Sequence, residues 1–131
     1  MTIGSALGKV QEIKPNGVSR ETMVDWLNEI DTTIYLEIVK THEFAENLVF
    51  TGYSSFEGTD ADRTMLLAPE PYSRLYIYWL CAQIDLQNQE FDLYQNNAAL
   101  FNQAYREYQN YCNRNFMPVE RSRFNTGGNK R

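Results

Sequence analysis

A chain of 131 residues with 43% hydrophobic side chains is long enough for one compact domain and too short for two. Its net charge of -5 argues against a general nucleic-acid-binding or acidic-membrane-binding protein, because such proteins concentrate Lys and Arg to neutralise phosphates. No apolar run approaches the roughly 20 residues needed to cross a bilayer, and the start lacks the apolar core of a secretory signal, so we expect an intracellular protein without a membrane partner.

The first predicted helix lies at the N-terminus and is short. Thr2 is a suitable N-cap, because its hydroxyl can accept a hydrogen bond from a free N–H of the first turn, and Pro15-Asn16-Gly17 ends the helical pattern. Its apolar residues recur at helical spacing: Ile3, Leu7, Val10 and Ile13. A helix of this length is marginal in water, so we expect packing against other elements to hold it.

A second helix is predicted to begin after Ser19, another N-cap candidate, with Glu21 near the positive end of the helix dipole. One face is apolar over about five turns and consists of Met23, Leu27, Ile30, Ile34 and Ile38. The acidic residues of this stretch are expected largely on the other faces: Asp25, Glu29 and Asp31. The apolar face needs a partner, which the C-terminal half of the chain can supply.

The segment from about residue 44 to residue 67 differs from its neighbours. Its two ends are apolar and strand-like, whereas its middle is rich in Gly, Ser, Thr and Asp. A short β-hairpin or an extended loop fits this pattern. Because the segment is too long for a passive connector in a compact domain, we interpret it as a contact loop, with Tyr53 and Phe56 as candidate contact residues.

Two amphipathic helices are predicted between Pro69 and Met117, folded back on each other at Asn88-Gln89-Glu90. Pro71 suits the first turn of the earlier helix, whose apolar stripe consists of Leu75, Tyr76, Trp79, Ala82 and Leu86. The later helix has seven residues on one face that we expect to be buried: Phe91, Tyr94, Ala98, Phe101, Tyr105, Tyr108 and Cys112. The short connection requires the two helices to be antiparallel.

These elements predict an all-α protein. Residues 1–117 form a small helical bundle built on the antiparallel hairpin, with the loop inserted between the second and third helices. Residues 118–131 have no helical period and form an extended basic tail, in which one acid, Glu120, accompanies Arg121, Arg123, Lys130 and Arg131. We expect the basic tail and the acidic body to have different roles.

Two tyrosines are candidate contacts with a second subunit or with another protein. Tyr78 and Tyr111 lie off the main apolar stripes. The remaining face of the last helix is polar but mostly uncharged, with Gln95, Asn96, Asn97, Asn102, Gln103, Gln109, Asn110 and Asn113. Packing against copies of the same chain explains this composition, and so does an ordinary polar surface.

No residue pattern indicates a catalytic, metal or cofactor site. His42, the one histidine, has Glu46 one turn away, but a metal site needs further ligands that the sequence does not supply. Cys81 and Cys112 lie on apolar stripes, too far apart to pair, and are interpreted as reduced core residues. The acidic loop residues, Asp60 among them, lack the rest of a calcium-binding pattern. We therefore expect a protein without enzymatic activity or cofactor.

Several segments, in their order along the chain, resemble the head-tail connector proteins of tailed phages, also called adaptor or head completion proteins. They are Ile3-Gly4, Lys14-Pro15-Asn16, Trp26-Leu27-Asn28-Glu29-Ile30, Pro69-Glu70-Pro71-Tyr72, Tyr78-Trp79-Leu80, Ala82-Gln83-Ile84-Asp85, Phe101-Asn102, Ala104-Tyr105 and Arg114. The resemblance covers most of residues 1–117, and the order and spacing of the segments make it fairly specific. The loop and the tail match less well.

The resemblance implies a small helical protein without enzymatic activity that assembles as a twelvefold ring beneath the portal at the capsid vertex. Such a ring extends the DNA channel, joins the portal to the next neck or tail-completion protein, and helps retain packaged DNA, which passes without sequence-specific binding. The protein is made in the host bacterial cytoplasm and resides in the virion, at the capsid-tail junction. An acidic body suits this channel, because like charge weakens binding to phosphates.

For the tail, we hypothesise contact with the portal through Val119, Arg121, Arg123 and Phe124, with Phe124 as the apolar anchor and the arginines pairing with acids. One alternative function stays open at this point. The chain could be a helical regulatory or adaptor module that binds one protein partner as a monomer or dimer, since nothing in the composition excludes it.

Overall fold

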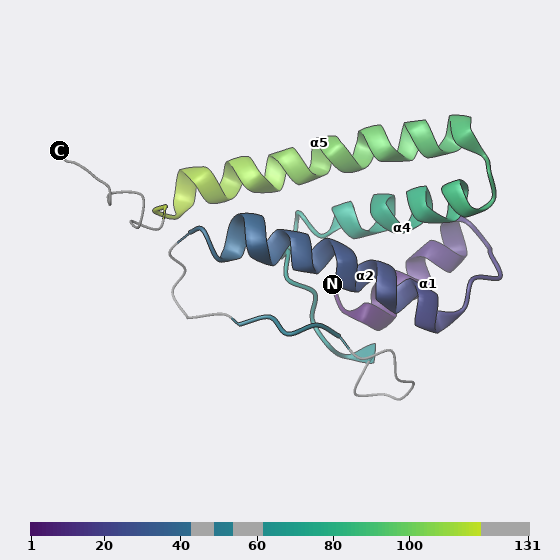
Figure 1. Cartoon of the computed structure of the whole chain (residues 1–131), viewed down its shortest axis with the longest axis horizontal. Coiled ribbons are helices and arrows are strands. Elements are labelled where there is room, and N and C mark those ends of the chain that lie inside the picture. The colour runs from purple at the N-terminus through teal and green to yellow at the C-terminus, as the bar shows by residue number, and fades with distance from the viewer. Residues whose placement is uncertain (43–48, 54–61, 119–131) are drawn as a thin grey trace.

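The computed structural model describes residues 1–42, 49–53 and 62–118. Its elements are α1 (Ile3–Ile13), α2 (Arg20–Ile34), a π-helical turn η1 (Tyr35–Val39), α4 (Arg74–Gln87) and α5 (Phe91–Asn115) (Figure 1). No strand occurs within the described ranges, and the helices form a small bundle. The predicted all-α class is therefore confirmed.

Local side-chain chemistry sets the start of the first two helices. The Thr2 hydroxyl accepts a hydrogen bond from the Ser5 N–H at 3.1 Å, and the Ser19 hydroxyl accepts one from the Thr22 N–H at 3.2 Å. Each satisfies an N–H that has no partner within its helix. Both N-caps predicted from the sequence are thus confirmed.

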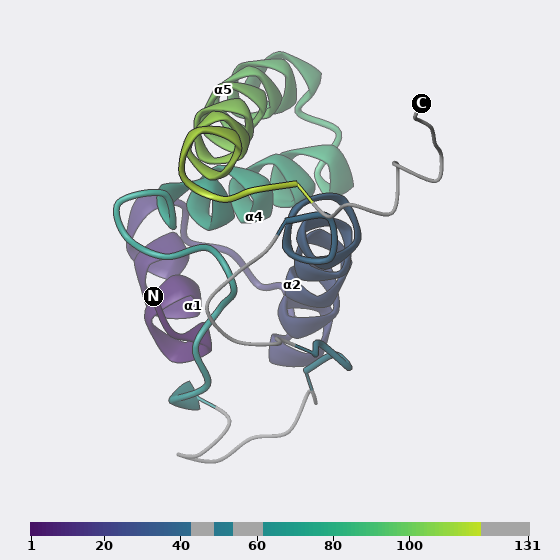
Figure 2. The ribbon, with the colours of Figure 1, turned by 90° about the vertical axis from the view of Figure 1, so that its left-hand side faces the viewer.

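α4 is the central element of the bundle. Figure 2 shows α5 lying along one side of α4, while α1 and α2 lie next to each other against its opposite side. Eight of the 14 residues of α4 are buried as a result. Fully buried side chains from α1, α2 and α4 meet in one core and include Ile3, Val10, Leu27, Ile34, Leu75, Leu80 and Ile84.

The turn between α4 and α5 lies at the predicted position. Gln89 has a positive φ of 60°, and the Glu90 N–H donates to the Asp85 carbonyl at 2.9 Å. The chain reverses within three residues, and α5 runs antiparallel to α4 (Figure 1). This hairpin is the framework on which the other helices pack.

The start of α4 differs from the prediction. Pro71 does not lie in the first helical turn, because the helix begins three residues later, at Arg74. The Tyr72 N–H donates instead to the Pro69 carbonyl at 2.8 Å, which closes a separate turn ahead of the helix.

The end of α2 also departs from a regular α-helix. In η1 the Lys40 N–H donates to the Tyr35 carbonyl at 2.8 Å, a spacing of five residues that defines a π-helical turn. His42 follows and is half-buried. Its Nδ1 lies 2.8 Å from the Ile38 carbonyl and its Nε2 lies 2.7 Å from the Asn113 side chain. The imidazole therefore links the end of η1 to the end of α5.

The described ends of the 44–67 segment contact different parts of the bundle. The Asn28 side chain of α2 accepts a hydrogen bond from the Tyr53 N–H and donates to the Tyr53 carbonyl, the latter at 2.9 Å. Met65 instead forms an isolated bridge with Thr2. Residues 49–53 and 62–67, the described parts of the segment, therefore do not pair with each other as the strands of a β-hairpin. The tip of the segment lies outside the described residues.

Candidate protein-contact surface

α5 is the longest helix and buries the least of its length. Only Tyr108 and Cys112 are buried among its 25 residues. The prediction that its whole apolar stripe is buried is therefore wrong: Phe91 is 57% exposed, and the residues that are half-buried are Tyr94, Ala98, Phe101 and Tyr105. The physical reason is that α5 packs mainly on a single helix, α4, which covers only part of its surface.

Further large apolar side chains are exposed near the hairpin. On α5 these are Leu93 and Leu100, seven residues apart and therefore on the same side of the helix. Ile13 at the end of α1 is 65% exposed, and Leu36 in η1 is 52% exposed. Single exposed apolar residues are ordinary on protein surfaces. Here, however, they border two long surfaces of the hairpin: the α1-side flank, which faces α1, and the α2-side flank, which faces α2.

The α1-side flank is hollowed. Two adjoining hollows, with volumes of about 310 and 390 Å³, open beside α4 and are both lined by Pro71, Arg74 and Tyr78. The apolar and charged residues that complete their walls include Lys9, Ile13, Glu70, Ile77, Leu100 and Glu107. Tyr78, a contact residue predicted from the sequence, thus lies in the wall that both hollows share. Helices α1, α4 and α5 all contribute to this surface.

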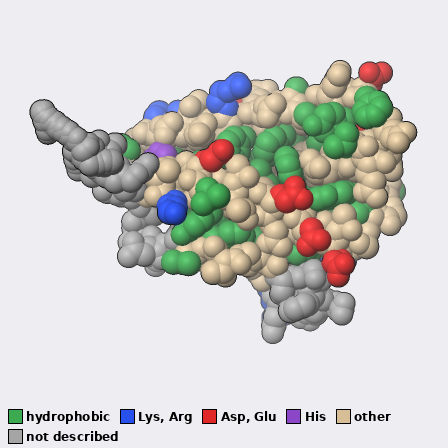
Figure 3. All heavy atoms as spheres, viewed as in Figure 1, with side chains coloured by type: hydrophobic (Ala, Val, Ile, Leu, Met, Phe, Trp, Pro, Cys, Tyr) green, Lys and Arg blue, Asp and Glu red, His purple; other side chains and the backbone are tan. Residues whose placement is uncertain are grey.

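The α2-side flank contains a row of half-buried aromatic side chains. The Trp79 indole N–H donates to the Trp26 carbonyl at 2.8 Å, and the Trp79 ring lies 5.1 Å from that of Phe101. Phe101 lies 5.7 Å from Tyr105, whose hydroxyl donates to the Glu37 carboxylate. Burial, and then the bond to Glu37, raises the pKa of Tyr105. Figure 3 shows apolar side chains gathered between α5 and α2 on this side.

The outer side of α2 is acidic. Glu21, Asp25 and Glu29 are all exposed and follow one another at intervals of four residues, which puts them on one side of the helix. Among the described residues, none of the three forms an ion pair. Acidic side chains are also visible over this part of the molecule in Figure 3. The α2-side flank therefore presents an acidic border beside its aromatic row.

The other predicted contact residues have different surroundings. Tyr53 is half-buried, and its hydroxyl donates to the Asp31 carboxylate. Tyr111 is half-buried too, with its ring 4.9 Å from that of Tyr72. Both tyrosines are therefore already engaged within the fold. The remaining predicted residues lie outside the described ranges: Phe56, Val119, Arg121, Arg123 and Phe124.

Asp31 on α2 is fully buried, which contradicts its predicted place on a solvent-facing side. It follows Leu27 by four residues and precedes Ile34 by three, so it lies within the apolar stripe. Its carboxylate accepts hydrogen bonds from the hydroxyl of Tyr76 at 2.6 Å, from the N–H of Leu67 at 3.1 Å, and from the hydroxyl of Tyr53. Desolvation raises the pKa of Asp31, although these hydrogen bonds act in the opposite direction.

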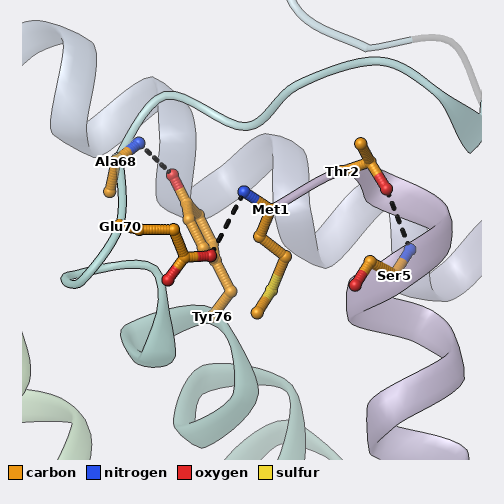
Figure 4. A network of polar contacts seen from close by, with 6 residues as sticks. All are labelled: Met1, Thr2, Ser5, Ala68, Glu70 and Tyr76. Carbon is orange, nitrogen blue, oxygen red and sulfur yellow. Dashed lines mark hydrogen bonds and ion pairs between the residues drawn. The ribbon is translucent and has the colours of Figure 1, made fainter.

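Tyr76 extends this network to the chain segment before α4. Its hydroxyl accepts a hydrogen bond from the Ala68 N–H at 2.7 Å (Figure 4). Beside it, the Met1 amine lies 3.5 Å from the Glu70 carboxylate. Burial raises the pKa of Tyr76, and the nearby Asp31 carboxylate raises it further. The network joins α2, α4 and the segment between them, so its evident role is to hold these parts together.

A second buried carboxylate lies near the other end of α4. Asp85 is fully buried, 2.7 Å from the ammonium of Lys14 at the end of α1, and it accepts a hydrogen bond from the Asn97 amide of α5 at 2.7 Å. The bond to Asp85 is the main cause that raises the pKa of Lys14. The ion pair connects the end of α1 to α4, and the hydrogen bond from Asn97 adds α5. The sequence patterns did not single it out, since one Lys and one Asp far apart in the chain give no local signal.

The described parts of the chain were compared with the requirements of a metal site, a disulfide and a membrane span. No three His, Cys, Asp or Glu side chains there come together in a group that could hold a metal ion. Cys81 and Cys112 are buried and unpaired, as predicted, and burial raises the pKa of both thiols. None of the described helices has the length and apolar character of a membrane span.

Comparison with family models, with curated proteins and with solved structures found no match to the chain.

Proposed function

We propose that the protein is a structural head-to-tail connector of a tailed phage. It forms a ring under the portal, extends the DNA channel, links the portal to the next neck or tail component, and helps retain packaged DNA. The observation that supports this most directly is the exposure of α5, a helix of 25 residues with only two buried. A surface of this kind suits a protein whose packing is completed by other subunits.

The charge distribution favours a protein that surrounds DNA over a protein that binds DNA. Residues 1–117 contain 16 Asp and Glu but only 8 Lys and Arg, whereas the tail is basic. An acidic wall repels phosphates, so a duplex can move past it without adhering. Residues 1–117 also expose side chains that neighbouring proteins can contact: the acidic residues of α2 and the row of aromatic residues that includes Trp79 and Phe101.

The tail is proposed to bind the portal through Arg121, Arg123 and the apolar Val119 and Phe124. Deleting residues 118–131 should abolish portal binding while the helical circular-dichroism signal is retained. A matched pair of variants refines this test, because each removes two positive charges. Arg121→Gln/Arg123→Gln should weaken binding strongly, and Lys130→Gln/Arg131→Gln only slightly. Undiminished portal binding by the deletion variant would exclude the tail as the portal contact.

The function itself is tested by the mass of the assembled protein. Light scattering on the purified chain, alone and then mixed with detached portal, should reveal a large species, which negative-stain imaging should show as a ring. A monomer or dimer that ignores the portal would contradict the connector function. That outcome would favour the alternative, a helical regulatory or adaptor module for one protein partner.

A further inference from the structure

We infer that neighbouring copies contact each other head to tail, with the acidic α2-side flank of one copy against the hollowed α1-side flank of the next. This inference rests on the proposed function, because it names the two surfaces by which the ring closes. It assigns a role to Tyr78 and Arg74 on one side and to Asp25 and Glu29 on the other.

The two flanks lie on opposite sides of the molecule. In Figure 2, α1 and α2 are on either side beneath α4, so the hollows near α1 face away from the acidic border of α2. A cyclic ring of more than two subunits requires contacts of this kind, in which one patch meets a different patch on the neighbour. Copies joined through these flanks would repeat in one direction and could close by rotation.

Charge distinguishes the two flanks. The α1-side hollows include the exposed cations Lys9 and Arg74. Of their two acids, Glu70 is paired with the Met1 amine, and Glu107 remains at the far edge on α5. The opposite flank presents an acidic border without ion pairs among the described residues, made of Glu21, Asp25 and Glu29. Opposite charges on two faces of one chain favour a second copy as the occupant over an unrelated protein.

Apolar side chains complement this charge pattern. Ile13 and Leu100 are exposed at the walls of the hollows, and Tyr78 lies between them. On the opposite flank, Leu36 projects from η1 with half of its surface exposed. Such an arrangement, with apolar residues bordered by charged ones, is typical of the core and rim of protein interfaces.

Charge reversal provides the test. The variants are Lys9→Glu/Arg74→Glu on the α1 side and Asp25→Lys/Glu29→Lys on the α2 side. Each alone should raise the protein concentration needed for half-maximal assembly at least about tenfold, because like charges then face each other. The matched control Arg63→Glu/Arg106→Glu has the same change in net charge as the first variant and should assemble like the wild type. Sedimentation and light scattering measure all of these concentrations.

Mixing supplies the decisive result. An equimolar mixture of the two reversed variants should assemble to within about threefold of the wild-type concentration, because every contact then pairs opposite charges again. Restoration also proves that both variants are folded. If the wild type forms a ring and both reversed variants do so equally well, the assignment of the flanks is wrong while the connector function stands. If the wild type forms no large species alone or with portal, both proposals fail.

Discussion

A buried aspartate lies near each end of α4, and the two carboxylates have different kinds of partner. Asp31 accepts hydrogen bonds from two tyrosine hydroxyls and one backbone N–H, without a cation among its described partners. Asp85 is paired with Lys14 and is also bonded to the amide of Asn97. The difference teaches that the same fold tolerates a buried carboxylate either by hydrogen bonding or by ion pairing. The two ends of α4 should therefore respond differently to substitution and to pH.

The largest expected effect is at the ion-paired end. Lys14→Met leaves Asp85 buried with Asn97 as its remaining side-chain partner, which should lower the free energy of unfolding by about 3 kcal/mol in urea titrations. The partial exposure of Lys14 keeps this loss at the lower end for buried pairs. Lys9→Met, an exposed site on the same helix, should change it by less than about 0.5 kcal/mol. Equal stabilities for the two variants would show that the ion pair contributes little.

A smaller loss is expected at the hydrogen-bonded end. Tyr76→Phe removes one donor to Asp31 and leaves the buried Ala68 N–H without its acceptor, so the free energy of unfolding should fall by about 2 kcal/mol. Tyr78→Phe is the matched control two residues along α4, at a half-buried position, and should be close to neutral. Thermal or urea unfolding measures both, and a loss confined to Tyr78→Phe would reverse the roles assigned here.

The smallest effect, but the most specific, concerns pH. Folding raises the pKa of Asp31 above its ordinary value of 3.8, so the folded state binds the Asp31 proton more tightly than the unfolded state. The stability that this provides is fully present below pH 3.8 and is lost as pH rises through the pKa of the folded state. Asp31→Asn does not titrate. The stability of the wild type relative to this variant should therefore decline as pH rises through the acidic range and then become constant. Asp25→Asn, at an exposed site, should follow the wild type throughout.

Much of the fold could be predicted from local patterns. The N-caps at Thr2 and Ser19 and the turn around Gln89 depend on a few neighbouring residues, and the sequence shows these directly. Whether a side chain is buried depends more on parts of the chain that are distant in sequence. Periodicity correctly indicated which side of α5 faces the protein, yet Phe91 on that side is mostly exposed. Whether a helical face is covered depends on the extent of the neighbouring helix, which periodicity does not reveal.

The buried polar groups were the least predictable features. Asp31 did give a signal, because its spacing from Leu27 and Ile34 places a carboxylate in the middle of an apolar stripe. Its partners could not be inferred, since Tyr53 and Tyr76 come from segments distant in the chain. Of the candidate contact residues, Tyr78 was placed by its spacing alone on a surface that the structure shows to be hollowed.

The order in which the ribosome makes the chain gives the Asp31 network a further consequence. Its partners Tyr53, Leu67 and Tyr76 follow it by 22, 36 and 45 residues. At a synthesis rate of 5–20 residues per second, Tyr76 is made about 2 to 9 seconds after Asp31. Throughout this interval α1 and α2 also lack α4, against which both pack. The N-terminal helices therefore cannot complete their fold first, and the domain becomes stable only after most of the nascent chain has been made.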